Sequence, residues 1–85
     1  MARKILVVDD EKLIRDVIKE YLLLEKMNVT EAENGLEAIE KVKEGNFDII
    51  IMDIMMPKMD GYTACREIKK IKDIPFIMLS ARGEE

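Results

Sequence analysis

The sequence predicts an α/β protein with a parallel sheet that carries helices on its faces. Four short apolar runs of strand character are separated by three segments in which apolar residues recur at helical spacing. Strands that alternate with helices imply parallel pairing through right-handed crossovers. Because the chain has only 85 residues, it provides one small domain.

The first half of the chain reads as strand, helix and strand. Ile5–Val8 is apolar and mostly β-branched, as in strands covered on both faces. Asp10 or Glu11 is expected to begin a helix, since negative charge is favourable at the positive end of the helix dipole. Met27–Ala32 alternates weakly and predicts a second strand. The helix between them has its apolar residues at Leu13, Ile14, Val17, Ile18, Tyr21 and Leu22.

The second half continues the alternation. A second helix follows Asn34-Gly35 and ends at Gly45, and Phe47–Met52 is a strongly apolar third strand. Asp60-Gly61 is expected to begin a third helix without taking part in chemistry. The fourth strand is predicted at 75–79, with proline at its first residue because proline donates no hydrogen bond. The residues expected on the buried helix faces are Leu36, Ala38, Ile39, Val42, Ala64, Cys65, Ile68 and Ile71.

Composition excludes several function classes. The net charge of −4 argues against nucleic acid as a partner, because neutralising phosphates needs a basic face. No apolar run approaches the ~18 residues of a membrane span, and no signal-peptide core follows Met1. A single cysteine fits a reducing cytoplasm, which is the expected location. The absence of histidine excludes the usual zinc sites and histidine acid–base catalysis.

Acidic side chains follow two of the predicted strands. Asp9 and Asp10 end the first strand, Asp53 ends the third, and Ser80 ends the fourth. If the first and third strands are neighbours, these groups converge at one edge, where strands lie about 4.8 Å apart. Three carboxylates so close repel one another unless a cation joins them. An oxygen-only donor set with few protein ligands suits Mg²⁺ better than Ca²⁺.

Asp53 is the best candidate for a nucleophile at this edge. A carboxylate beside a metal ion can form an acyl phosphate, with Asp9 and Asp10 holding the metal, Asp10 through water. Simpler interpretations exist for each residue alone. Asp9-Asp10 can be a strand end followed by a helix cap, and Asp53 can be a turn residue.

Three segments together resemble a known family. "ILVVDD", "DIIIMDIMMPKMDG" and "PFIMLSA" are similar to the signature segments of receiver domains of bacterial two-component response regulators, in order along the whole chain. The resemblance implies a flavodoxin-like sheet of order 2-1-3-4 and a sensor histidine kinase that phosphorylates Asp53. It places Mg²⁺ among Asp9, Asp10, Asp53 and the Met55 carbonyl. It also makes Ser80 the switch hydroxyl that bonds the phosphoryl group, with the Ala81 amide beside it.

The sequence departs from the family pattern after the fourth strand. The family continues with a helix, a strand and a helix, and its fifth strand ends in a lysine that pairs with the phosphate. Residues 1–85 are therefore expected to form one truncated receiver domain. Loss of one such donor costs on the order of 10²–10³ in rate, so phosphoryl transfer is expected to be slow. The exposed fourth strand, or exchange of elements, is expected to make the chain a homo-oligomer.

Three functions follow as competing hypotheses. The first is a signalling module that accepts phosphate stoichiometrically and is not an enzyme. The second is a self-associating structural fragment without signalling activity. The third is a small phosphatase with an aspartyl nucleophile, for which the sequence offers no evident general acid.

Overall fold

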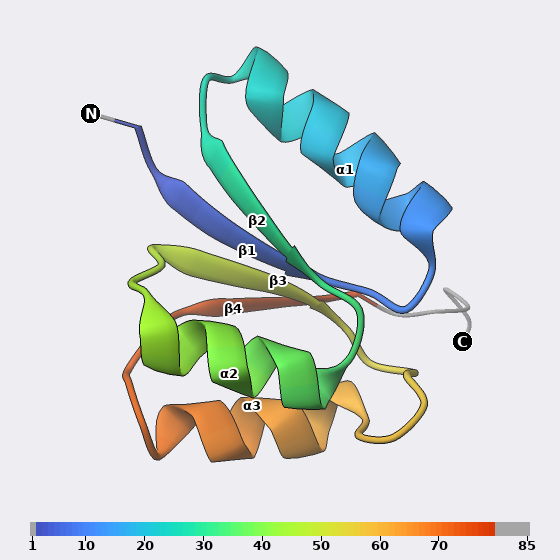
Figure 1. Ribbon diagram of the computed structural model, residues 1–85, viewed down its shortest axis with the longest axis vertical. Coiled ribbons are helices and arrows are strands. Elements are labelled where there is room, and N and C mark those ends of the chain that lie inside the picture. Colours follow the sequence, from blue (N-terminus) through green and yellow to red (C-terminus); the bar gives the residue numbers. More distant parts are fainter. Residues whose placement is uncertain (1, 80–85) are drawn as a thin grey trace.

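The computed structural model describes residues 2–79, which form four strands and three helices in strict alternation (Figure 1). Predicted and observed elements agree in type and order. The bounds are β1 (Lys4–Val8), α1 (Lys12–Leu24), β2 (Asn28–Ala32), α2 (Gly35–Glu44), β3 (Ile49–Asp53), α3 (Gly61–Lys69) and β4 (Phe76–Leu79).

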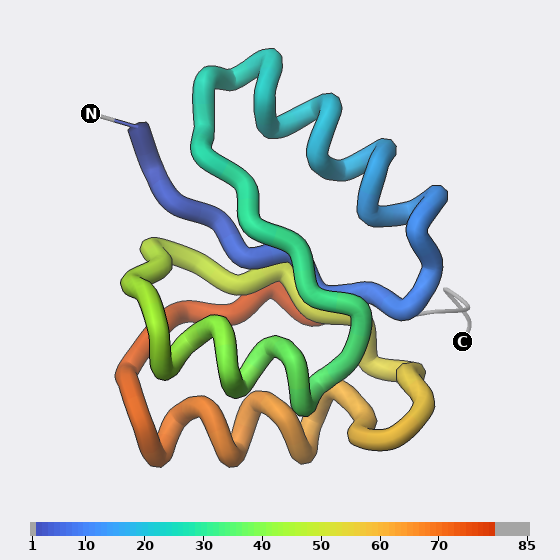
Figure 2. The backbone as a smooth tube through the Cα atoms, viewed as in Figure 1, coloured from blue at the N-terminus to red at the C-terminus, as the bar shows by residue number. Residues whose placement is uncertain are grey.

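The four strands form one parallel sheet in the order β2-β1-β3-β4, as the resemblance implied. All strands therefore point the same way. Figure 2 shows the connections that leave the carboxyl ends of β1, β2 and β3 gathered along the same side of the molecule. Asp9 and Asp53 are next to each other at this edge, because Val8 pairs with Met52 in the register of β1 and β3.

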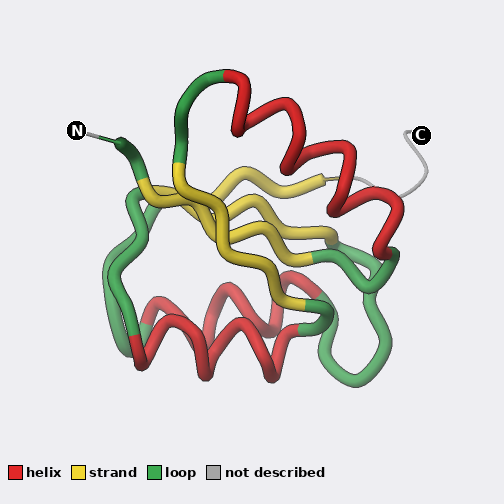
Figure 3. Tube along the Cα trace, turned by 45° about the horizontal axis from the view of Figure 1, so that its top comes forward, coloured by secondary structure: helices red, strands yellow, loops and turns green. Residues whose placement is uncertain are grey.

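The helices divide between the two faces of the sheet (Figure 3). α2 and α3 lie side by side on one face, and α1 lies on the other. Because successive strand residues point to opposite faces, alternate residues of β1 and β3 enter the layer between the sheet and α2 and α3. The resulting core consists of Leu6, Val8, Ala32, Ala38, Val42, Ile50, Met52, Ala64, Ile68 and Ile74.

Helix α1 is less buried than its apolar pattern predicts. None of its residues is fully buried, and Leu13, Val17 and Tyr21 are more than half exposed. α1 packs over β1 and β2, so within residues 2–79 no helix covers β3 and β4 on this face. An apolar groove of about 310 Å³ lies there, lined in part by Leu22, Ile51 and Ile77.

Two other predicted core positions differ in the structure. Leu36 is 51% exposed at the start of α2, and Ile71 is 40% exposed beyond the end of α3. Helical spacing identifies a face but not its limits, and these residues lie in the first turn of α2 and just after the end of α3. Pro75 immediately precedes β4 rather than opening it, and its carbonyl accepts the Ile50 amide at 3.0 Å.

Candidate metal centre at the carboxyl edge of the sheet

Three carboxylates converge where β1 and β3 end. One oxygen from each of Asp9, Asp10 and Asp53 can be chosen so that all three atoms lie within 4.8 Å of one another. Two different segments of the chain supply them: the β1–α1 loop carries the acidic pair, and the last residue of β3 is the third acid. Parallel pairing of β1 with β3 therefore builds the cluster that the sequence predicted.

Two of the three acids are buried. Asp9 is 5% exposed and Asp53 is 7% exposed, whereas Asp10 is exposed on the loop. The Glu11 amide donates to Oδ1 of Asp9 at 2.9 Å, and the Met55 amide donates a long bond to Oδ1 of Asp53 at 3.4 Å. A buried carboxylate with so few donors is a poorly compensated anion.

The electrostatics of Asp53 follow from this placement. Burial raises the pKa of its carboxyl group, and the negative charges of Asp9 and Asp10 raise it further. Amide hydrogen bonds from Met55 and Ile54 act in the opposite direction without cancelling the rise. No lysine or arginine in the described part of the chain pairs with these three carboxylates. The ionised site thus carries a repulsion that a bound cation would relieve.

The donor set fits Mg²⁺. Its three atoms are carboxylate oxygens, which hard divalent cations prefer, and Asp10 faces solvent, where a cation can keep bound water. The Met55 amide lies beside Asp53, but the role of the Met55 carbonyl as a ligand stays a prediction. The predicted switch hydroxyl of Ser80 and the Ala81 amide lie outside the described residues.

Gly61 supports this site in a way that the local sequence does not predict. The sequence predicts that Asp60-Gly61 begins a helix, and Asp60 does cap α3 by accepting the Thr63 amide at 2.8 Å. Gly61 also donates to the Ile54 carbonyl at 2.8 Å. A Cβ atom at Gly61 would overlap the main-chain oxygen of Asp53 and approach the Ile54 Cα to 2.9 Å. The start of α3 therefore packs directly against the main chain of Asp53 and Ile54.

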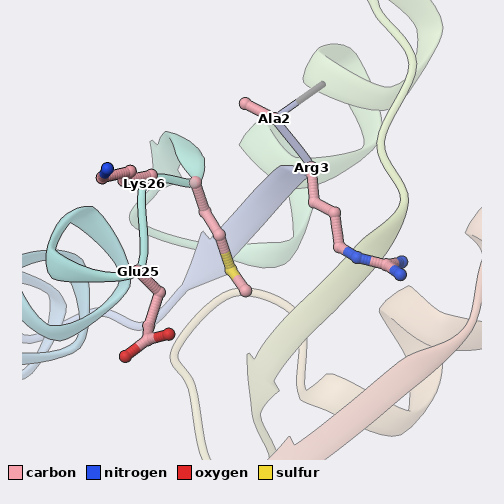
Figure 4. A pocket seen from close by; sticks show the side chains of 5 residues that line it. Ala2, Arg3, Glu25 and Lys26 are labelled. Carbon is pink, nitrogen blue, oxygen red and sulfur yellow. The ribbon is translucent and has the colours of Figure 1, made fainter.

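Another hollow lies at the opposite, amino end of the sheet. Ala2, Arg3, Glu25, Lys26 and Met27 line it, and Figure 4 shows its charged side chains pointing in different directions. Glu25 is its single carboxylate. This hollow lacks the converging oxygen donors of the acidic cluster, so the cluster at the carboxyl edge is the candidate site.

Comparison with known proteins identifies the family. The family model for the response regulator receiver domain matches residues 5–85 of the sequence. The chain is 54% identical over 82 residues to the transcriptional regulatory protein ResD of Bacillus subtilis, covering 96% of this chain and 34% of ResD. It thus spans about a third of the length of this curated relative.

Solved structures share both fold and sequence with the chain. Response regulator protein TrrA from Thermotoga maritima, in complex with Mg²⁺-BeF, is 45% identical with a TM-score of 0.89, over 95% of this chain and 71% of TrrA. Chemotaxis protein CheY4 of Vibrio cholerae is 31% identical with a TM-score of 0.92, over 99% of this chain and 72% of CheY4. The fold is the flavodoxin-like α/β fold of this family.

None of the helices between residues 2 and 79 is both long and apolar enough to cross a membrane.

We expect Gly61→Ala to lower the free energy of unfolding by about 1–3 kcal/mol, the usual cost of overpacking, because the added methyl group meets main-chain atoms. Gly45→Ala is the matched control. Its Cβ meets only the Lys41 carbonyl at 3.9 Å, and its backbone is extended. Urea denaturation of the two variants makes the comparison. Equal effects would contradict the close packing of α3 against Asp53.

Asp53→Asn is expected to raise the melting temperature at pH 7 in the presence of a chelator. The pKa of Asp53 is raised in the folded state, so ionisation costs stability as pH rises from its ordinary carboxylate range, about pH 4, through the folded value. The advantage of Asn should therefore shrink on acidification and vanish below that window. Asp73→Asn, on the surface, controls for net charge. Thermal melts over this pH range measure the difference. Equal changes in melting temperature for Asp53→Asn and Asp73→Asn would contradict the electrostatic cost at Asp53.

Proposed function

Since the chain belongs to the family of response regulator receiver domains, we propose that it accepts a phosphoryl group on Asp53 in the presence of Mg²⁺. The observation that carries the proposal is the cluster of Asp9, Asp10 and Asp53, whose oxygens lie within 4.8 Å of one another. The similar protein TrrA was solved in complex with Mg²⁺-BeF, which supports a metal-assisted phosphoryl site here.

The proposed step is a displacement at phosphorus. A carboxylate oxygen of Asp53 forms a bond to phosphorus while the bond from phosphorus to the leaving group breaks, and the leaving group keeps the electron pair. Bound Mg²⁺ supplies positive charge that offsets the charge on the carboxylates and the phosphoryl oxygens. Asp9 and Asp10 would hold the metal, the Met55 carbonyl would be a further ligand, and burial of Asp53 would limit competing attack by water.

The phosphoryl donor in this proposal is a sensor histidine kinase, and the chain is a stoichiometric acceptor rather than an enzyme. Histidine is absent from the chain, so a phosphohistidine must be supplied by a partner. We place the encounter in the cytoplasm, where a single unpaired cysteine stays reduced. The chain matches only about a third of ResD. Transcriptional regulation is therefore proposed only for a longer protein that contains this domain, and not for residues 1–85 by themselves.

Incubation with Mg²⁺ and acetyl phosphate tests the acceptor role. We expect intact-protein mass spectrometry to show the gain of one phosphoryl group, which Asp53→Asn or a chelator abolishes and Asp73→Asn preserves. The time course also measures the slow transfer expected from the sequence. Labelling that persists in Asp53→Asn, or no labelling of the folded chain with Mg²⁺, would rule out the proposal, and catalytic turnover of the donor would favour the phosphatase hypothesis.

A second function, self-association, is favoured by the free side of β4. Among residues 2–79, β4 pairs with β3 alone, so one side of its backbone has no strand partner. Ile77 is 46% exposed and lines the apolar groove together with Ile49 and Ile51. Such an edge is a template for another strand, and we propose that a second copy of this chain occupies it as a dimer related by two-fold symmetry.

Light scattering at high micromolar concentration measures this association. We expect the chain to be a dimer and Ile77→Lys to be a monomer, because a charge on an edge strand opposes pairing. Leu13→Lys, on the exposed side of α1, should leave the dimer intact. A well-folded monomer of the unmodified chain would contradict the proposal.

A further inference from the structure

Arg15 reaches from the first turn of α1 back to the main chain of Asp9. Its Nη1 donates to the Asp9 carbonyl oxygen at 2.7 Å, and its side chain is only 14% exposed. Among the described residues, the guanidinium bonds none of the carboxylates of Asp9, Asp10 and Asp53. It therefore does not compete with a cation for those oxygens. Arg15 thus contacts the loop that carries the cluster without entering the cluster itself.

Glu31 holds the guanidinium in place. Its Oε1 accepts from Arg15 Nε at 3.0 Å, and its Oε2 accepts from Lys19 Nζ at 3.2 Å. Burial acts to raise the pKa of Glu31, but the hydrogen bonds and charges of Arg15 and Lys19 outweigh it and lower the pKa. Glu31 is therefore ionised at neutral pH, so its ion pair with Arg15 is present at that pH.

Asp9 is anchored to the end of β2 by two routes. Its amide donates to the Ala32 carbonyl at 3.2 Å, and its carbonyl accepts from Arg15, which is bound to Glu31, the neighbour of Ala32. The main-chain amide and carbonyl of Asp9 are thus both held. Without the second anchor, mutual repulsion of the three carboxylates would be free to turn the peptide that joins Asp9 to Asp10.

We propose that Arg15, oriented by Glu31, is a positioning residue that fixes the Asp9 peptide so that Asp9 and Asp10 present their carboxylates to a divalent cation. The inference rests on the proposed function, because it assigns Arg15 a role in metal binding at that site. Hydrogen-bonding partners that orient metal ligands commonly affect affinity by about 10–100-fold. The simpler alternative is that the ion pair only joins α1 to β2.

Metal affinity separates the two roles. Mn²⁺ binding to the full chain, followed by electron paramagnetic resonance, should weaken about tenfold or more in Arg15→Gln, while circular dichroism shows the same fold. Lys12→Gln is the matched control. It removes one positive charge from the same turn of α1, where the partner of Lys12 within residues 2–79 is the half-buried Asp16 at 2.9 Å, and it should change affinity by about twofold or less.

The outcomes distinguish this inference from the proposed function. Failure of the unmodified chain to bind Mn²⁺ would overturn both. Binding by the unmodified chain with equal affinity in folded Arg15→Gln would overturn the positioning role alone. If Arg15→Gln does not fold, Glu31→Ala decides, because it keeps the guanidinium and removes the carboxylate that accepts from it. A several-fold loss of affinity supports the role, and an unchanged affinity rejects it.

Discussion

Repulsion among three carboxylates at one edge of a parallel sheet is the constraint around which this structure is built. Asp9 and Asp53 are buried, and both are brought together by the register that pairs β1 with β3. Asp53 is also held by its pairing with Leu79 of β4, and the amide of Asp9 is held by the Ala32 carbonyl of β2. The chain therefore stores an electrostatic cost in its folded state, and a divalent cation is the natural partner that offsets it.

The rest of the fold holds the acids in this arrangement. Core residues between the sheet and the helices α2 and α3 fix β1 and β3 from one face. Gly61 allows α3 to begin against the peptide of Asp53, and Arg15 ties the peptide of Asp9 to β2. All three helices contribute to this support. The geometry of the cluster is therefore a property of the whole domain rather than of one loop.

Local sequence patterns predicted most of the fold and the three acids. The order of strands and helices along the chain followed from hydrophobic periodicity. The sheet order that brings Asp9, Asp10 and Asp53 together came from the resemblance to receiver domains. Long-range main-chain packing was not predictable in this way. Gly61 read as a helix start because nothing local shows that Asp53 lies against it, and the bond from Arg15 to the loop arises only once α1 folds back over β2.

Binding of a divalent cation at this acidic edge would broaden nearby signals in a two-dimensional NMR spectrum during titration with paramagnetic Mn²⁺. We expect selective loss of the amide signals of Asp9, Asp10 and Ile54 at substoichiometric metal, while signals of Arg3 and Lys26 at the opposite end of the sheet persist. Uniform broadening, or broadening centred on the amino end, would contradict it.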